Sequence, residues 1–278
     1  MASLSTATDG QITEFKGRLA RAGFSAEIIR EVNTGDDNEL AEVMFEVLMR
    51  HPRFTLVHGI FTSADKQIAR VREWKKEFGW GISDEAFAAV KKSVPAWPEQ
   101  KLVAVVLVPY LADKANEDET VTTGLERTFH ELWMRAKSEQ DANWHWDGYD
   151  KAGSDRLRLH KGIEHPSTSS GQAILLWEVI DLGCNRNKKP MDVRNSKSSP
   201  HAGILAAAAL HPNWVKSMDG DKVPYVFAPG YEVQVPGEKP WTNVPGLGFD
   251  RDRRKIQLGC YWSSGCGSRW AVPSFFRE

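Results

Sequence analysis

The chain has little of several features that mark large protein classes. It contains three cysteines among 278 residues, which are too few for the disulfide framework of a small secreted protein. Its longest apolar run, residues 102–112, is about half the length of a membrane-spanning helix and contains Pro109. Residues 1–10 are polar and lack the apolar centre of a signal peptide. We therefore expect a soluble, cytoplasmic protein that has no membrane partner.

The motifs of the best-known catalytic and nucleotide-binding classes are also missing. The sequence has no phosphate-binding G-x-x-x-x-G-K-[ST], no zinc-protease H-E-x-x-H and no nucleophile elbow G-x-S-x-G. Residues 246–248 read Gly-Leu-Gly, but they lie in a predicted loop that no helix follows, so they do not form a dinucleotide motif. The identity of any cofactor stays open at this point.

What is present is typical of a globular protein of mixed structure, with 41% hydrophobic and 26% charged residues. Helical spacing of apolar residues dominates as far as the break at residues 95–98, and runs typical of strands follow. Helices first and strands later predict an α+β fold, with a helical N-terminal region followed by a mixed or antiparallel sheet with packed helices. We place the boundary between residues 1–97 and 98–278, although one continuous domain is also compatible with the pattern.

Individual elements follow from caps and apolar runs. Ser63 and Ser83 are expected to cap two helices, and Ser199 with Pro200 is expected to begin a third. The apolar runs at residues 101–110 and 173–182 predict strands that are buried on both faces. Further strands are expected nearer the C-terminus, at residues 156–160, 223–227, 231–235, 255–262 and 269–272.

Three segments carry a resemblance to other proteins. They are WEVIDLG at 177–183, MDVRN at 191–195 and SPHAGILAAAALHP at 199–212. Together they resemble uncharacterised protein families of small-genome bacteria, over most of the chain after Arg53. The resemblance implies a bacterial cytosolic setting and assigns no activity or site residue.

The charge is unevenly distributed along the chain. Residues 1–150 carry a formal charge of −7 and residues 151–278 carry +6, which together give the net −1. The two halves could simply attract each other in the folded protein. Alternatively, the basic half could meet an anionic partner such as nucleic acid.

The strongest candidate site lies between the second buried strand and the helix after it. Asp181 ends that strand and His201 stands at the start of the helix, whose free backbone amides would attract an anion. Four basic side chains in this loop are candidate ligands for a phosphate, a carboxylate or a nucleic-acid backbone: Arg186, Lys188, Lys189 and Arg194. As an enzyme, the protein would use Asp181 as the base and His201 as the acid or orienting group.

Further candidate functional residues are Glu178, Cys184 and some of the tryptophans. Glu178 lies inside the second buried strand, where a carboxylate must be paired, hydrogen-bonded or protonated. Cys184 is an alternative nucleophile, since nearby basic residues could lower the pKa of its thiol. Of the eleven tryptophans, Trp144 and Trp146 are candidate stacking platforms for the bases of a nucleic acid. Such rings could equally bind a sugar or a peptide, or pack against one another.

These observations leave interpretations from three classes. The first is a soluble binding protein that recognises an anionic ligand or nucleic acid through the basic loop and exposed aromatic rings. The second is a small cytosolic enzyme that acts on a phosphate- or carboxylate-bearing substrate with Asp181 and His201. The third is a scaffold whose N-terminal helices present an acidic surface to a partner. The oligomeric state stays open.

Overall fold

The computed structural model describes most of the chain from residue 60 onward. The described ranges are 60–98, 100, 102–116, 121–139, 144–145, 156–166, 172–195, 197–250, 252–253 and 255–276. All of them belong to one compact unit, Leu56–Glu278. The helices predicted before residue 60 lie outside the described residues. Helices and antiparallel or mixed sheets pack together in this unit, which confirms the predicted α+β fold.

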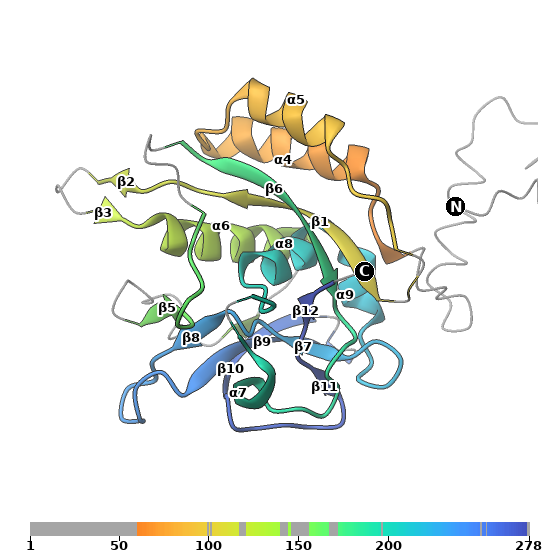
Figure 1. Ribbon diagram of the computed structural model, residues 1–278, viewed down its shortest axis with the longest axis vertical. Helices are drawn as coiled ribbons and strands as arrows, with labels where there is room; N and C mark the ends of the chain where they lie inside the picture. Colours follow the sequence, from red (N-terminus) through yellow and green to blue (C-terminus); the bar gives the residue numbers. More distant parts are fainter. Residues whose placement is uncertain are drawn as a thin grey trace, which may run out of the picture. The chain divides into compact units, whose positions relative to one another are not determined.

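A three-stranded antiparallel sheet lies between two layers of helices (Figure 1). Its strands, in spatial order, are β1 (Val103–Tyr110), β6 (Ile174–Asp181) and β12 (Ser274–Phe275). The helices on one face are α4 (Ala64–Phe78) and α5 (Asp84–Lys92). Those on the other face are α6 (Gly124–Glu139) and α8 (Ala202–Leu210).

A second, larger sheet is built mainly from the C-terminal part of the chain. Its spatial order is β11-β7-β9-β10-β4, and β8 pairs with both β9 and β5. The bounds of these strands are β4 (Trp144–His145), β5 (Leu157–Leu159), β7 (Tyr225–Phe227), β8 (Tyr231–Val233), β9 (Asn243–Asp250), β10 (Lys255–Trp262) and β11 (Trp270–Ala271). The remaining elements are the strand pair β2 (Lys114–Ala115) and β3 (Val121–Thr122), and the short helices α7 (Pro190–Val193) and α9 (Pro212–Ser217).

Several elements form where the sequence predicts them. Ser63 is the N-cap of α4, and Ser83 caps α5 by accepting a hydrogen bond from the backbone N–H of Ala86. Every residue of β1 is buried, as its continuous apolar run predicts. All nine residues of α8 are buried too, which explains why this alanine-rich helix is apolar around its whole circumference. None of the described helices is long and apolar enough to cross a membrane.

The predicted loop at residues 246–248 is wrong, because Gly246, Leu247 and Gly248 lie in the middle of β9. Glycine is unfavourable in a strand unless another group needs the space that a side chain would fill. Here a Cβ on Gly246 would lie 2.6 Å from the ring of Tyr261. The glycines therefore mark a close approach to aromatic rings rather than a turn.

The compact unit begins earlier than the predicted boundary at residue 98. Helices α4 and α5 precede that boundary, yet they pack against β1 and β6. The apolar faces of both helices belong to the same core as the sheet, and Trp177 of β6 donates its indole N–H to the carbonyl oxygen of Val90 in α5. Residues 60–97 are therefore part of the α+β unit.

Candidate functional site

One face of the second sheet is covered with aromatic rings. Trp270 of β11 lies opposite Tyr225 of β7, and Phe227 follows two residues later on the same face. Phe227 pairs with Gly246 of β9, which in turn pairs with Gly259 of β10. These residues share one side of the sheet, and its other side contributes to the main hydrophobic core through β7, β9 and β10. We call the first side the aromatic face.

The rings of the aromatic face pack on one another because the neighbouring strands carry glycine. The Tyr261 ring lies over Gly246 and Gly259, where added Cβ atoms would come within 2.6 Å of it. Its centroid is 4.6 Å from that of Trp270, and Phe227 stacks on Trp270 at the same separation. This contact pattern fixes the three rings as one rigid wall.

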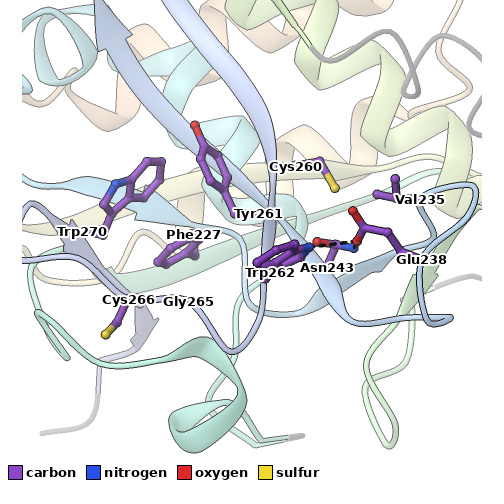
Figure 2. A pocket seen from close by; sticks show the side chains of 10 residues that line it. All are labelled: Phe227, Val235, Glu238, Asn243, Cys260, Tyr261, Trp262, Gly265, Cys266 and Trp270. Atoms are coloured by element: carbon purple, nitrogen blue, oxygen red, sulfur yellow. Dashed lines mark hydrogen bonds between the residues drawn. The ribbon is translucent and has the colours of Figure 1, made fainter.

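A pocket of about 430 Å³ opens beside this wall (Figure 2). The residues around it come from β7, β9, β10, β11 and the turns that join them: Phe227, Val235, Glu238, Asn243, Cys260, Tyr261, Trp262, Gly265, Cys266 and Trp270. The volume lies within the range of about 300–1,000 Å³ that is usual for small-molecule sites, and the lining combines aromatic rings with a few polar groups.

Glu238 fixes the position of the most exposed ring in the pocket. Trp262 is 63% exposed, and its indole N–H donates a hydrogen bond of 2.9 Å to Oε2 of Glu238. The Asn243 side-chain amide donates to the same oxygen at 2.8 Å. Figure 2 shows the three side chains side by side at one end of the pocket. A large apolar ring is thus exposed yet held in one orientation, next to a carboxylate.

The predicted basic loop attaches to the outside of this region. The backbone N–H of Asn187 donates to the carbonyl oxygen of Trp270, and that of Met191 donates to Ser263. Val193 of α7 packs with the rings of the aromatic face in a small separate hydrophobic cluster. The loop is therefore a structural neighbour of the pocket, although none of its residues is among those that line it.

Two of the four predicted basic ligands are engaged within the protein. Arg186 donates hydrogen bonds to the carbonyl oxygens of Asp221 and Lys222. Arg194 has a side chain only 9% exposed and forms an ion pair of 2.9 Å with Glu232, which also binds Arg158 and His160. These contacts indicate structural roles for Arg186 and Arg194.

Burial alone would raise the pKa of Glu232. The hydrogen bonds from His160 and Arg158, together with the charge of Arg194, outweigh that effect and hold the pKa below its ordinary value. Glu232 is therefore ionised at neutral pH, and Arg194 compensates its charge.

Of the other predicted binding residues, two lie at exposed positions and two have side chains that the structure does not describe. Lys188 and Lys189 are exposed. Trp144 lies in β4, whose backbone pairs in parallel with β10 at Gln257, but its side chain is not described. Trp146 lies outside the described residues.

The structure does not bring Asp181 and His201 together as an acid–base pair. Asp181 is three residues after Glu178, so the two side chains leave β6 on opposite faces. Oδ1 of Asp181 accepts a hydrogen bond from the backbone N–H of Gly183. His201 precedes α8 on the Glu178 side, where its ring contacts Tyr110 and Tyr231. The strand separates the two groups, so the sequence-based pairing has no support.

His201 is instead part of a buried polar cluster around Glu178. The Tyr110 hydroxyl donates a short hydrogen bond to Oε1 of Glu178, which confirms the prediction that this carboxyl needs a partner. Burial raises the pKa of Glu178 to about 7, against the opposing effect of that bond. Burial and the nearby His165 lower the pKa of His201 to about 3, so its imidazole is neutral at pH 7.

Several polar atoms of this cluster are buried and lie close to backbone. Oε2 of Glu178, both ring nitrogens of His201 and the Tyr231 hydroxyl are buried and have no hydrogen-bond partner among the described residues. Yet a Cβ on Gly203 would lie 2.0 Å from Oε2 of Glu178, and one on Gly230 would lie 2.7 Å from Cβ of His201. The backbone of Gly203 therefore lies directly against the Glu178 carboxylate, and that of Gly230 lies against the Cβ of His201.

Cys184 does not have the properties of a nucleophile. Burial raises the pKa of its thiol, and its sulfur lies 3.2 Å from both Ser274 Oγ and the Asp181 carbonyl oxygen. The alternative of a Cys184 thiolate therefore gains no support, because burial outweighs the hydrogen bond with Ser274 and the charge of Asp181 adds to the effect of burial. Among the described residues, no group of three or more histidine, cysteine or acidic side chains is arranged to hold a metal ion.

Comparisons with protein-family models, with curated proteins and with solved structures found no match for this chain. The resemblance to bacterial families therefore stays a prediction.

Sequence reasoning missed the central parts of the pocket. Glu238 and Trp262 are 24 residues apart and meet only through the pairing of β9 with β10, in which Trp262 lies opposite Asn243. One usable signal was the row of glycines in β9 and β10 near Tyr261 and Trp262, which is unusual inside paired strands.

Proposed function

We propose that this protein is a binding protein that takes a small organic ligand into the pocket beside the aromatic face. The observation that carries the proposal is the Trp262 ring, which is 63% exposed and yet fixed by its hydrogen bond to Glu238. An exposed indole loses hydrophobic stabilisation, and that loss is recovered when a ligand covers its face.

The form of the pocket supports a small molecule. Its wall of Phe227, Tyr261 and Trp270 is pre-organised by ring contacts, so little ordering is needed when a ligand binds. The polar groups of Glu238 and Asn243 gather at one end and would orient the ligand.

Saturation-transfer NMR with four probes tests this proposal: indole, 3,3-dimethyl-1-butanol, choline and methyl glucoside. At least one probe should receive saturation from the wild-type protein and lose it in Trp262→Ala. Trp97→Ala is the matched control, because Trp97 is 37% exposed and does not line the pocket. The proposal is contradicted if no probe is saturated, or if Trp262→Ala binds as well as wild type.

The second candidate function is the binding of an anionic ligand or nucleic acid, through a smaller surface than the whole basic loop. It is favoured by the exposed pair Lys188 and Lys189, which follow Asn187, the residue anchored to Trp270. These lysines would meet a phosphate backbone beside the aromatic face.

Fluorescence anisotropy with labelled single-stranded DNA tests the second candidate at low and high salt. Affinity should fall as salt rises and should weaken in Lys188→Ala/Lys189→Ala. The control is Lys91→Ala/Lys92→Ala, an exposed lysine pair at the end of α5. Equal losses in the two variants would show only general charge attraction.

A further inference from the structure

We infer that the ligand of the aromatic pocket is an organic cation, an alkylated or quaternary ammonium group. This inference rests on the proposed binding function and names its chemical class. Three features of the pocket favour a cation: the charge of its lining, the position of its carboxylate and the exposed face of Trp262.

Charge complementarity favours a cation. Within the part of the chain that the structure describes, the ten lining residues include one acidic side chain, Glu238, and no lysine, arginine or histidine. A phosphate or carboxylate inside the pocket would therefore face a carboxylate without a compensating cation. A positively charged ligand would face the opposite charge.

The geometry of Glu238 leaves it able to attract a second group. Both hydrogen bonds that fix the side chain, from Trp262 and from Asn243, go to the same oxygen, Oε2. A carboxylate has acceptor sites on both oxygens. Glu238 is itself exposed, so its charge acts on the pocket opening while its position is fixed.

The exposed Trp262 ring supplies the rest of a cation site. The negative face of an indole or phenol ring attracts a cation within about 6 Å of the ring centroid, and tryptophan is the strongest of the rings. Trp262 presents an exposed ring directly beside Glu238. A quaternary ammonium group has no N–H donor, so rings together with one carboxylate match its needs better than hydrogen-bonding side chains do.

Isothermal titration of the full chain with choline and with 3,3-dimethyl-1-butanol tests the inference. The two probes have the same shape and differ in the positive charge. We expect choline to bind about ten-fold more tightly or better, since a cation–π contact with a nearby carboxylate contributes on the order of 1–2 kcal/mol.

Two substitutions separate the effect of the ligand's charge on binding affinity from the effect of its shape. Glu238→Gln retains an acceptor for the Trp262 indole and removes the charge, so it should reduce choline affinity several-fold and leave the alcohol unaffected. Trp262→Leu should weaken both probes. Glu77→Gln, a change of an exposed glutamate on α4, is the matched control and should change neither affinity.

The outcomes distinguish the two proposals. Equal affinities for choline and the neutral alcohol, or a Glu238→Gln variant that binds choline as wild type does, would overturn the cation inference and leave the binding function standing. Binding of indole or methyl glucoside without binding of choline would likewise overturn the cation inference and leave the binding function standing. If no probe binds, both proposals fail.

A further arm identifies the source of the cation. An alkylammonium group could belong to a free metabolite or to a modified lysine side chain. Titration with Nα-acetyl-Nε-trimethyllysine amide compares the second source with choline. Tighter binding of choline supports a free ligand, and tighter binding of the lysine derivative supports a group carried on a peptide; either result supports the cation.

Discussion

At the scale of single residues, the protein places several polar groups where burial decides their protonation. Burial raises the pKa of Glu178 to about 7 and lowers the pKa of both His201 and His211 to about 3. Of the described residues, Tyr110 alone hydrogen-bonds the Glu178 carboxyl, while Oε2 lies against the backbone of α8 at Gly203. The carboxyl therefore opposes folding once it is ionised.

We predict a pH-dependent stability difference between wild type and Glu178→Gln. Between pH 4.5 and 7 the folded state holds a proton on Glu178 that the unfolded chain has lost, so wild-type stability falls as pH rises through this window. The glutamine variant lacks this dependence. Its free energy of unfolding relative to wild type should rise by about 3 kcal/mol from pH 4.5 to pH 8.

Urea denaturation at these two pH values measures the difference. The buried histidines make both proteins less stable as pH falls below about 6.5, and this contribution cancels in the comparison. Glu77→Gln, which alters an exposed glutamate, should show a flat difference. A flat difference for Glu178→Gln as well would mean that Glu178 is not buried as described.

Gly246 offers a second residue-scale prediction. A Cβ at this position would lie 2.6 Å from the Tyr261 ring and 2.9 Å from the Trp270 ring. Gly246→Ala should therefore cost about 1–3 kcal/mol of stability and displace the wall of the pocket. Gly81→Ala is the control, because nothing lies within 4 Å of its added Cβ. Comparable thermal stability of the two variants would contradict the close packing.

At the scale of elements, helix α4 protects the edge of the first sheet. Strand β1 is the edge strand, and the Gln67 side chain of α4 binds it as a neighbouring strand would. Gln67 accepts a hydrogen bond from the Leu107 backbone N–H and donates to the Val105 carbonyl oxygen, each at 2.9 Å. The Gln67 side chain thereby supplies hydrogen-bond partners for backbone groups at the buried edge of β1.

We predict that Gln67→Ala destabilises the protein by about 2–4 kcal/mol, since it leaves two buried backbone groups of β1 without partners. Chemical denaturation measures the change. Lys66→Ala alters the exposed neighbour on the same helix and should have little effect. If the two substitutions cost the same, the side chain of Gln67 does not pair with the strand.

The individual helices and strands show which parts of the fold could be predicted from the sequence and which could not. Caps and apolar runs located α4, α5, β1 and β10, because their signals are local in the chain. Strand β9 was missed, since its glycines are explained by Tyr261, a residue of the next strand. A similar limit applies to the basic loop, since local charge density does not reveal that Arg194 is buried against Glu232.

At the scale of the whole molecule, the two sheets and the helices around them form one unit from Leu56 to Glu278. Its main hydrophobic core includes residues of α4, β1, α8 and β9 together. This continuity explains why helices assigned by sequence to an N-terminal region belong with the sheet. Most rings of the aromatic face belong instead to a separate small cluster around Phe227 and Val272, which Tyr261 and Trp270 pack against.

We predict that a chain beginning at Leu56 folds and retains the pocket. Circular dichroism and thermal denaturation should show a cooperative transition close to that of the full chain. Probe binding by this shortened chain should equal that of the full chain. Loss of the cooperative transition would show that residues 1–55 contribute to the core of the unit.

The central claim is that the aromatic pocket takes an organic cation against Trp262. Its most direct test is the indole ¹H–¹⁵N resonance of Trp262, assigned by its disappearance in Trp262→Phe and followed during a choline titration. We predict that this resonance shifts and saturates along with that of Trp270, while that of Trp97 stays in place. An unmoved Trp262 resonance at saturating choline, or equal shifts of all indole signals, would contradict the account.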